Sequence, residues 1–167
     1  MGGLKGLKGS GAIIFALRDF LIQKREILEK YDRIILTRAD YYYLRAHPNL
    51  PNNFIWVVEG EDYGGITDRH HVFPVKLLDQ VLGVIDFLDS DALLKKLHET
   101  NNYNPEKFLL DMFRFYKIDV LIKRFTRIQF TVATKDDVTR WKEAKKRMPG
   151  EKDIFLKYKS EYTQATK

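Results

Sequence analysis

Hydrophobic and polar residues alternate along this chain in patterns typical of both helices and strands. Over residues 12–30, apolar side chains recur at three- and four-residue intervals with charged residues between them, which predicts an amphipathic helix covering a sheet. The β-branched runs at residues 33–37 and 54–58 predict two buried strands. Between them, residues 47–53 hold two prolines and three asparagines, which oppose regular structure and predict a loop.

The second half of the chain continues this alternation after a polar, glycine-containing segment at residues 59–71. We predict helices there over residues 74–88, 92–98, 105–116 and 136–147, and strands over residues 118–122 and 128–133. Asn104 and Pro105 fit the cap and first turn of a helix, and we expect a structural role for Glu106 in that turn. The mixture predicts an α/β fold with one small mixed sheet flanked by helices.

Length and composition bound the class of protein. A chain of 167 residues that is 44% hydrophobic can bury one core, so we expect a single domain over residues 1–167, with a flexible start at 1–11 and a charged carboxyl-terminal tail at 148–167. No window approaches the ~20 apolar residues of a membrane span, and no secretory signal is recognisable, so we expect a cytoplasmic protein. The absence of cysteine excludes disulfides, thiolate metal sites and a cysteine nucleophile.

The formal net charge of +6 favours anionic partners, which include nucleotides, phosphates, nucleic acid and acidic lipid. Charge alone does not choose among them. The chain lacks helix-turn-helix, zinc-finger and RNP-type signatures, and its basic residues are interspersed with acids. We therefore do not expect nucleic acid as the main partner.

Asp40 is the first candidate site residue, because it follows the apolar run of residues 33–37 and so falls at the end of a predicted strand. A carboxylate placed there can ligate Mg²⁺ or Mn²⁺ held by a diphosphate. Arg38, two residues earlier, either contacts phosphate or pairs with Asp40. The alternative is a buried structural pair between these two residues.

The segment at residues 59–71 concentrates four carboxylates, one arginine and two histidines around a Gly-Gly pair. Glycines let the backbone approach a ligand closely, and carboxylates bind sugar hydroxyls or take a proton from one. The alternative is an acidic, solvated turn in which Asp68 caps the next helix. The adjacent His70 and His71 point to opposite sides of an extended chain, which argues against a shared zinc ion.

Together these segments resemble a known family. The sequence Y-D-R-I-I-L-T-R-A-D-Y-Y-Y-L at residues 31–44 precedes E-G-E-D-Y-G-G-I-T-D-R-H at residues 59–70, and N-P-E and D-V-T-R-W follow later. This order resembles nucleotide-sugar glycosyltransferases of the surface-polysaccharide type found in bacteria and large DNA viruses. In them, a strand with Y-D-x-x-I-x-x-R-x-D precedes a G-G-x-x-D-R loop. The similarity covers residues 11–141.

The resemblance implies a GT-A-like transferase that moves a sugar from a nucleotide-sugar donor to a glycan acceptor. An R-x-D sequence stands where many such enzymes have D-x-D, so Arg38 replaces one of two metal-binding carboxylates. The implied roles are a Mn²⁺ or Mg²⁺ ligand at Asp40 and a catalytic base or acceptor-binding carboxylate at Asp62 or Asp68. Donor-phosphate contacts fall to Arg38 and Arg69, and acceptor contacts to Glu61, Tyr63 and His70.

One departure concerns the amino terminus. GT-A enzymes usually begin with a strand–loop–helix half that holds the nucleotide base, whereas here a Gly/Lys stretch precedes the first predicted helix. We expect the chain to correspond to the later part of such an enzyme, and to self-associate or use a partner chain at an exposed sheet edge. The alternative function is a non-catalytic, degenerate or partial module that binds sugar or nucleotide.

Overall fold

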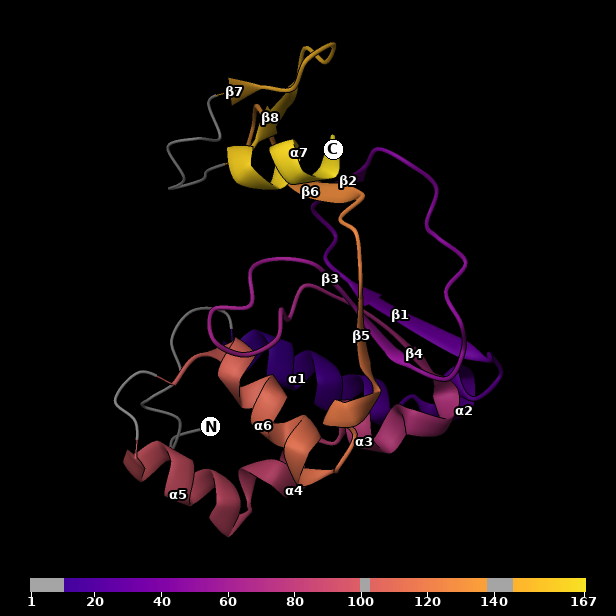
Figure 1. Ribbon diagram of the computed structural model, residues 1–167, viewed down its shortest axis with the longest axis vertical. Coiled ribbons are helices and arrows are strands. Elements are labelled where there is room, and N and C mark those ends of the chain that lie inside the picture. Colours follow the sequence, from indigo (N-terminus) through magenta and orange to yellow (C-terminus); the bar gives the residue numbers. More distant parts are fainter. Residues whose placement is uncertain (1–10, 100–102, 138–145) are drawn as a thin grey trace. The chain divides into compact units, whose positions relative to one another are not determined.

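The computed structural model describes residues 11–99, 103–137 and 146–167, which fall into two compact units (Figure 1). Unit 1 comprises residues 1–36 and 51–124, and unit 2 comprises residues 37–50 and 125–167. Each unit has its own hydrophobic cluster. The predicted α/β class is confirmed, with two four-stranded sheets in place of the single sheet that we expected. That residues 1–167 act as one domain stays a prediction.

Unit 1 combines most of the helices with the first sheet. Its elements are α1 (Gly11–Ile22), α2 (Arg25–Leu28), β1 (Arg33–Thr37), β3 (Ile55–Val58), β4 (His70–Pro74), the 3-10 helix η1 (Val75–Leu77), α3 (Leu78–Leu82), α4 (Val84–Leu88), α5 (Asp91–Glu99), α6 (Pro105–Phe115), the 3-10 helix η2 (Asp119–Leu121) and β5 (Ile122–Phe125). The strand order is β1-β4-β3-β5, and β3 and β4 run antiparallel. β1 and β5 reach the boundary with unit 2.

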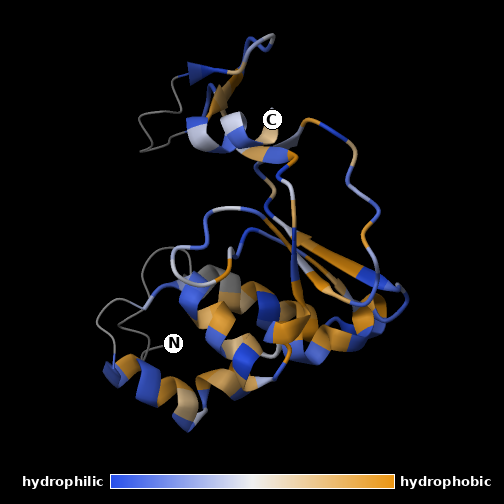
Figure 2. Cartoon of the chain, in the orientation of Figure 1, coloured by the Kyte–Doolittle hydropathy of each residue, from blue (hydrophilic) through white to orange (hydrophobic). Residues whose placement is uncertain are grey.

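The core of unit 1 forms where the helices pack against the sheet, and Figure 2 shows hydrophobic residues along both. Ile55 and Phe73 from the strands are fully buried, as is Phe108 of α6. The ring of Phe108 lies 4.1 Å from that of Phe15 in α1 and 5.0 Å from that of Phe87 in α4. Burying each such side chain stabilises the fold by about 1.5–3 kcal/mol, so these residues fix α6 against the sheet.

Several predicted elements of unit 1 are confirmed. β1 coincides with the predicted strand, β3 differs from its prediction by one residue, and α5 and α6 match two predicted helices. Asn104 caps α6 as expected, because its side-chain oxygen accepts a hydrogen bond of 2.8 Å from the backbone N–H of Lys107.

Two predicted helices are shorter than expected and one predicted strand is wrong. The helix over residues 12–30 divides into α1 and α2, and the helix over 74–88 divides at Gly83, where a Cβ atom would lie 2.4 Å from the carbonyl oxygen of Asp79. The apolar run at 118–122 forms η2, and only its last residue starts β5. A short apolar run does not distinguish a strand from a tight helical turn.

In its described residues, unit 2 forms an antiparallel sheet with one helix. Its elements are β2 (Tyr41–Tyr43), β6 (Gln129–Thr134), β7 (Lys146–Arg147), β8 (Ile154–Leu156) and α7 (Lys159–Ala165), and the strand order is β2-β6-β8-β7. All three neighbouring pairs run antiparallel. The fully buried Phe130 has its ring 5.6 Å from that of Tyr42 and 5.1 Å from that of Tyr162, which joins β2 and α7 to β6.

The predictions for unit 2 had mixed outcomes. The strand predicted at 128–133 is confirmed as β6 within one residue. The segment predicted as a charged tail instead forms β8 and α7. Most of the helix predicted at 136–147 lies outside the described residues, and its last two residues pair with β8 as β7. Within the described part of the chain, no helix has the length and apolar character needed to cross a membrane.

Candidate functional site

The loop between β3 and β4 has an unusual backbone. φ is positive at Gly60 (91°), Glu61 (61°), Tyr63 (43°) and Gly64 (87°). Non-glycine residues adopt positive φ only rarely, at a free-energy cost that the surroundings must offset, and such residues gather at functional sites. The backbone conformation and the residue composition therefore both indicate this loop as a candidate site.

The first turn of α6 holds this loop in place. The N–H of Ile66 donates a hydrogen bond of 3.1 Å to the carbonyl of Glu106, and the side-chain amide of Asn104 donates one of 2.9 Å to the carbonyl of Tyr63. Gly65 lies so close to α6 that a Cβ atom there would be 2.0 Å from the oxygen of Glu106. Only glycine fits at this position, so the Gly-Gly pair is required for loop packing.

Two ion pairs stabilise the loop, one within it and one to β5. Glu61 Oε2 lies 2.9 Å from Arg69 Nη1, and both side chains are nearly buried, at 13% and 11% exposure. Asp62 Oδ1 accepts hydrogen bonds from Arg124 Nη1 (2.9 Å) and from the backbone N–H of Thr67 (3.0 Å). Glu61 and Asp62 therefore serve to position the loop.

Glu106 has the most distinctive electrostatic environment near the loop. Its side chain is half-buried, and burial raises the pKa of its carboxyl group above the usual range. The negative charges of Asp68 and Asp62 raise this pKa further, whereas Arg69 lowers it. We call Asp62, Asp68 and Glu106 the carboxylate cluster. A carboxyl group with a raised pKa binds a proton more readily than an ordinary carboxylate, and groups of this kind gather at functional sites.

A buried Arg–His pair supports the loop from α1. Arg18 is fully buried, donates a hydrogen bond of 2.6 Å to the carbonyl of Val81, and lies 3.1 Å from Nδ1 of His71. The carbonyl of Thr67 can only accept, so His71 donates to it through Nε2 and receives from Arg18 at Nδ1. Burial, with Arg18 as the next cause, lowers the pKa of His71 to about 3. His71 is therefore neutral, and its tautomer is fixed.

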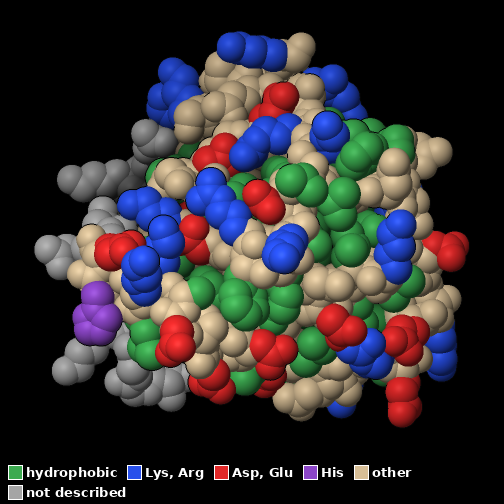
Figure 3. Space-filling model, turned by 60° about the horizontal axis from the view of Figure 1, so that its bottom comes forward, with side chains coloured by type: hydrophobic (Ala, Val, Ile, Leu, Met, Phe, Trp, Pro, Cys, Tyr) green, Lys and Arg blue, Asp and Glu red, His purple; other side chains and the backbone are tan. Residues whose placement is uncertain are grey.

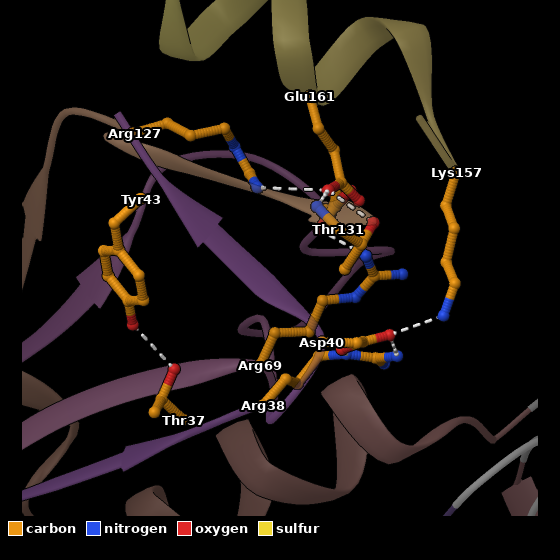
Figure 4. Close-up of polar contacts among 10 residues, drawn as sticks. Thr37, Arg38, Asp40, Tyr43, Arg69, Arg127, Thr131, Lys157 and Glu161 are labelled. Carbon is orange, nitrogen blue, oxygen red and sulfur yellow. Dashed lines mark hydrogen bonds and ion pairs between the residues drawn. The ribbon is translucent and has the colours of Figure 1, made fainter. Parts of the chain in front are cut away.

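Asp40 lies in the turn between β1 and β2, just beyond the carboxyl end of β1 as predicted. Figure 4 shows Arg38 and Lys157 both directed at its carboxylate. Arg38 donates through Nε to Oδ1 (2.7 Å) and through Nη2 to Oδ2 (2.8 Å), and Lys157 Nζ lies 2.8 Å from Oδ2. Of the two alternatives for Arg38, the structure shows the ion pair with Asp40.

These contacts do not fit a divalent metal at Asp40. Burial alone would raise the pKa of Asp40, but hydrogen bonds from Arg38 and Lys157 outweigh it and hold the pKa well below its usual range. Both oxygens are occupied by cations that would repel Mg²⁺ or Mn²⁺. Among the described residues, no group of three or more His, Cys, Asp or Glu side chains is arranged to hold a metal ion.

The remaining predicted site residues are not equally accessible. The side chain of Tyr63 is exposed, whereas His70 is fully buried in β4, so we leave His70 out of the candidate site. Asp68 precedes β4, so it does not cap a helix as the alternative interpretation required. Arg38 and Asp40 belong to unit 2 and the loop belongs to unit 1, so a cleft shared by Asp40 and the loop stays a prediction.

Glu106, Arg124, Arg18 and Lys157 were not predicted as members of a site. Each lies more than 30 residues along the sequence from its side-chain partner, and Arg124 lies within β5, where no local pattern marks it as a site residue. The N-P-E motif contained the one available hint, because it places Glu106 in a first helical turn. No protein-family model, curated protein or solved structure matches this chain. Function must therefore be argued from the chemistry of the site.

Proposed function

We propose that the chain is a GT-A-like glycosyltransferase domain that transfers a sugar from a nucleotide-sugar donor to a glycan acceptor, with the carboxylate cluster of unit 1 as its reaction centre. The observation that carries this proposal is the raised pKa of Glu106 beside Asp68 and Asp62. The positive-φ loop that holds these acids against α6 supports it, because strained backbone is maintained where geometry matters.

In the proposed reaction, an acceptor hydroxyl attacks the anomeric carbon while the bond from that carbon to the diphosphate oxygen breaks. A carboxylate takes the proton of the hydroxyl, and the electron pair of the broken bond leaves with the diphosphate. Asp62 is already engaged at Oδ1 by Arg124 and by the N–H of Thr67, so we assign it to positioning. Glu106 is the better base because its pKa is raised, and Asp68 is the second candidate.

The proposal includes no step through a metal at Asp40, because Arg38 and Lys157 already neutralise that carboxylate. It also assigns Arg69 to positioning, since its guanidinium pairs with Glu61. Tyr63, which is 57% exposed at the tip of the loop, is the residue best placed to contact an acceptor. Its ring offers an apolar face and a hydroxyl, which suits a sugar.

A non-catalytic module that binds sugar or nucleotide is the second candidate function. The observation that favours it is the pairing of loop acids with arginines: Glu61 with Arg69, and Asp62 with Arg124. Acids that are paired with arginines can shape a binding loop without taking part in a reaction. This alternative differs from the first in one measurable respect, because the ligand would bind and remain intact.

The test measures binding and turnover together in the purified chain. Calorimetry with a panel of nucleotide-sugars, with and without Mn²⁺, reports binding, and release of nucleoside diphosphate in the presence of oligosaccharide acceptors reports transfer. Glu106→Gln should lower turnover by about 10²–10⁴-fold while leaving donor binding unchanged. Glu59→Gln is the control, because Glu59 is exposed at the start of the same loop. Binding without turnover supports the non-catalytic module, and neither binding nor turnover contradicts both candidates.

A further inference from the structure

Unit 1 contains a cavity of about 320 Å³ between α5 and α6, at the tip of the loop that carries the Gly-Gly pair. Cavities of this size accommodate a small ligand. The charged residues that line it are Lys96 and Glu99 from α5, and Lys107, Asp111 and Arg114 from α6. Gly64 and Tyr103 complete the polar side of the wall.

The three cations come from two helices and converge on one space. Lys107 and Arg114 are seven residues apart on α6, which places them on the same face two turns from each other. Lys96 reaches the cavity from α5. Convergent ammonium and guanidinium groups suit an anion with several oxygens, such as a phosphate group.

The two carboxylates make the cavity unsuitable for phosphate alone. Asp111 accepts a hydrogen bond of 3.1 Å from the hydroxyl of Tyr103 and one of 3.3 Å from Arg114 Nη1, and Glu99 lines the same wall. Burial, together with Asp111, raises the pKa of Tyr103, so its hydroxyl stays protonated and fixes Asp111. Carboxylates repel a phosphate but accept hydrogen bonds from hydroxyl groups. A ligand that carries both groups satisfies both kinds of side chain.

The Gly-Gly pair links the cavity to the carboxylate cluster. A Cβ atom on Gly64 would lie 3.1 Å from Cε of Lys107, a cavity residue, whereas one on Gly65 would lie 2.0 Å from the carbonyl oxygen of Glu106. Two consecutive loop residues thus pack on two consecutive helix residues, one in the cavity wall and one in the cluster. A ligand in the cavity therefore lies next to the loop that carries the proposed reaction centre.

We propose that this cavity binds a sugar phosphate, with the phosphate at Lys96, Lys107 and Arg114 and the sugar hydroxyls at Glu99 and Asp111. This inference adds to the proposed function the groups that would hold the anionic donor. Binding itself does not depend on the proposed function, and only the transfer reaction that follows binding rests on it. It replaces the earlier assignment of phosphate contacts to Arg38 and Arg69, which are paired with Asp40 and Glu61.

Titration of the full chain with glucose 1-phosphate, glucose and inorganic phosphate tests the proposal, with binding followed by calorimetry and by amide chemical shifts. We expect the sugar phosphate to bind at least about tenfold more tightly than either fragment, because only it satisfies both sets of side chains. The double variant Lys96→Ala/Arg114→Ala should weaken its binding by about tenfold or more. Both residues are exposed, so the fold should tolerate the change.

Lys95→Ala is the matched control, because Lys95 is the exposed neighbour of Lys96 on α5 and does not line the cavity. Equal binding by Lys95→Ala and the double variant overturns the proposal, as does inorganic phosphate that binds as tightly as the sugar phosphate, or no binding at all. Glu106→Gln should still bind the sugar phosphate. Binding by the parent chain without any sugar transfer would therefore overturn the transferase proposal and leave the cavity assignment intact.

Discussion

The two units differ sharply in charge. Unit 1 contains 16 Lys and Arg residues against 16 Asp and Glu, whereas unit 2 contains 13 against 7, so the whole formal net charge of +6 belongs to unit 2. On the face that Figure 3 shows, acidic and basic side chains are interspersed around hydrophobic ones. The excess positive charge that suggested anionic partners therefore lies in unit 2, whereas the carboxylate cluster lies in unit 1.

The difference shows how each unit uses its carboxylates. In unit 1, Asp62 and Asp68 lie close enough to Glu106 to raise its pKa, and Arg124 holds Asp62 in place. In unit 2, Asp40 is held by Arg38 and Lys157, and Glu161 is buried. The carboxylates of unit 1 include one whose pKa is raised, whereas these two carboxylates of unit 2 are held by cations or by hydrogen bonds.

The largest predicted effect concerns Glu161, which joins α7 to β6. Its Oε2 accepts from the backbone N–H (2.6 Å) and the hydroxyl (2.7 Å) of Thr131, and Arg127 Nη1 lies 3.8 Å away (Figure 4). Glu161→Ala would leave a buried guanidinium without its carboxylate, so we expect a loss of about 3–5 kcal/mol in the free energy of unfolding. Urea unfolding, followed by amide signals from each unit, measures it.

The matched control for this change is Glu151→Ala, because Glu151 is exposed in the same unit. It should alter the free energy of unfolding by less than about 0.5 kcal/mol. Amide signals of unit 2 should change more than those of unit 1 in Glu161→Ala. A loss below about 1 kcal/mol, or equal changes in both units, would contradict the structural role assigned to Glu161.

Substitution of one glycine in each unit gives a second comparison of the two units. Gly65→Ala places a methyl group against the carbonyl of Glu106, and we expect it to lower the free energy of unfolding by about 1–3 kcal/mol and to displace the loop. Gly150→Ala meets no atom within 4 Å, but φ there is +84°, so its cost should be about 1 kcal/mol. Thermal unfolding measures the loss of stability in each variant. Equal losses in the two variants would show that the loop shifts to accommodate the methyl group at position 65 at little cost.

The sequence predicted this molecule best where the signals were local. β1, β6 and α6 were found because their apolar patterns and the Asn104 cap need no distant partner. β4 was missed because H-H-V-F-P is buried at every position and so lacks the polar alternation of a half-exposed strand. The loop at 59–71 was recognised from its composition. Glu106 lies about forty residues later in the sequence, and only the fold brings it next to the loop.

A third prediction concerns pH and unit 1. His71 has an ordinary pKa of 6.5, and burial lowers it to about 3 in the folded protein, so between these values only the unfolded chain binds the proton. Stability should therefore fall as the pH is lowered from about 6.5 toward 3, by at most about 1.4 kcal/mol per pH unit from this group. Unfolding in urea at several pH values should give a smaller pH dependence for His71→Gln, and an unchanged one would contradict the assignment.

The smallest predicted effect decides what Asp40 does. Its carboxylate is partly exposed and paired with Arg38 and Lys157, so Asp40→Asn should lower the free energy of unfolding by only about 1 kcal/mol. Because the folded state holds the pKa of Asp40 below its ordinary 3.8, this contribution is present above that pH and is lost as the pH falls through the folded value.

Mn²⁺ should stabilise neither the parent chain nor the variant. Thermal unfolding with and without Mn²⁺, and titration with a nucleoside diphosphate and Mn²⁺, measure both expectations. Equal nucleotide affinity in the two proteins identifies Asp40 as a structural residue, whereas Mn²⁺-dependent binding that only Asp40→Asn abolishes would restore the metal site implied by the R-x-D motif.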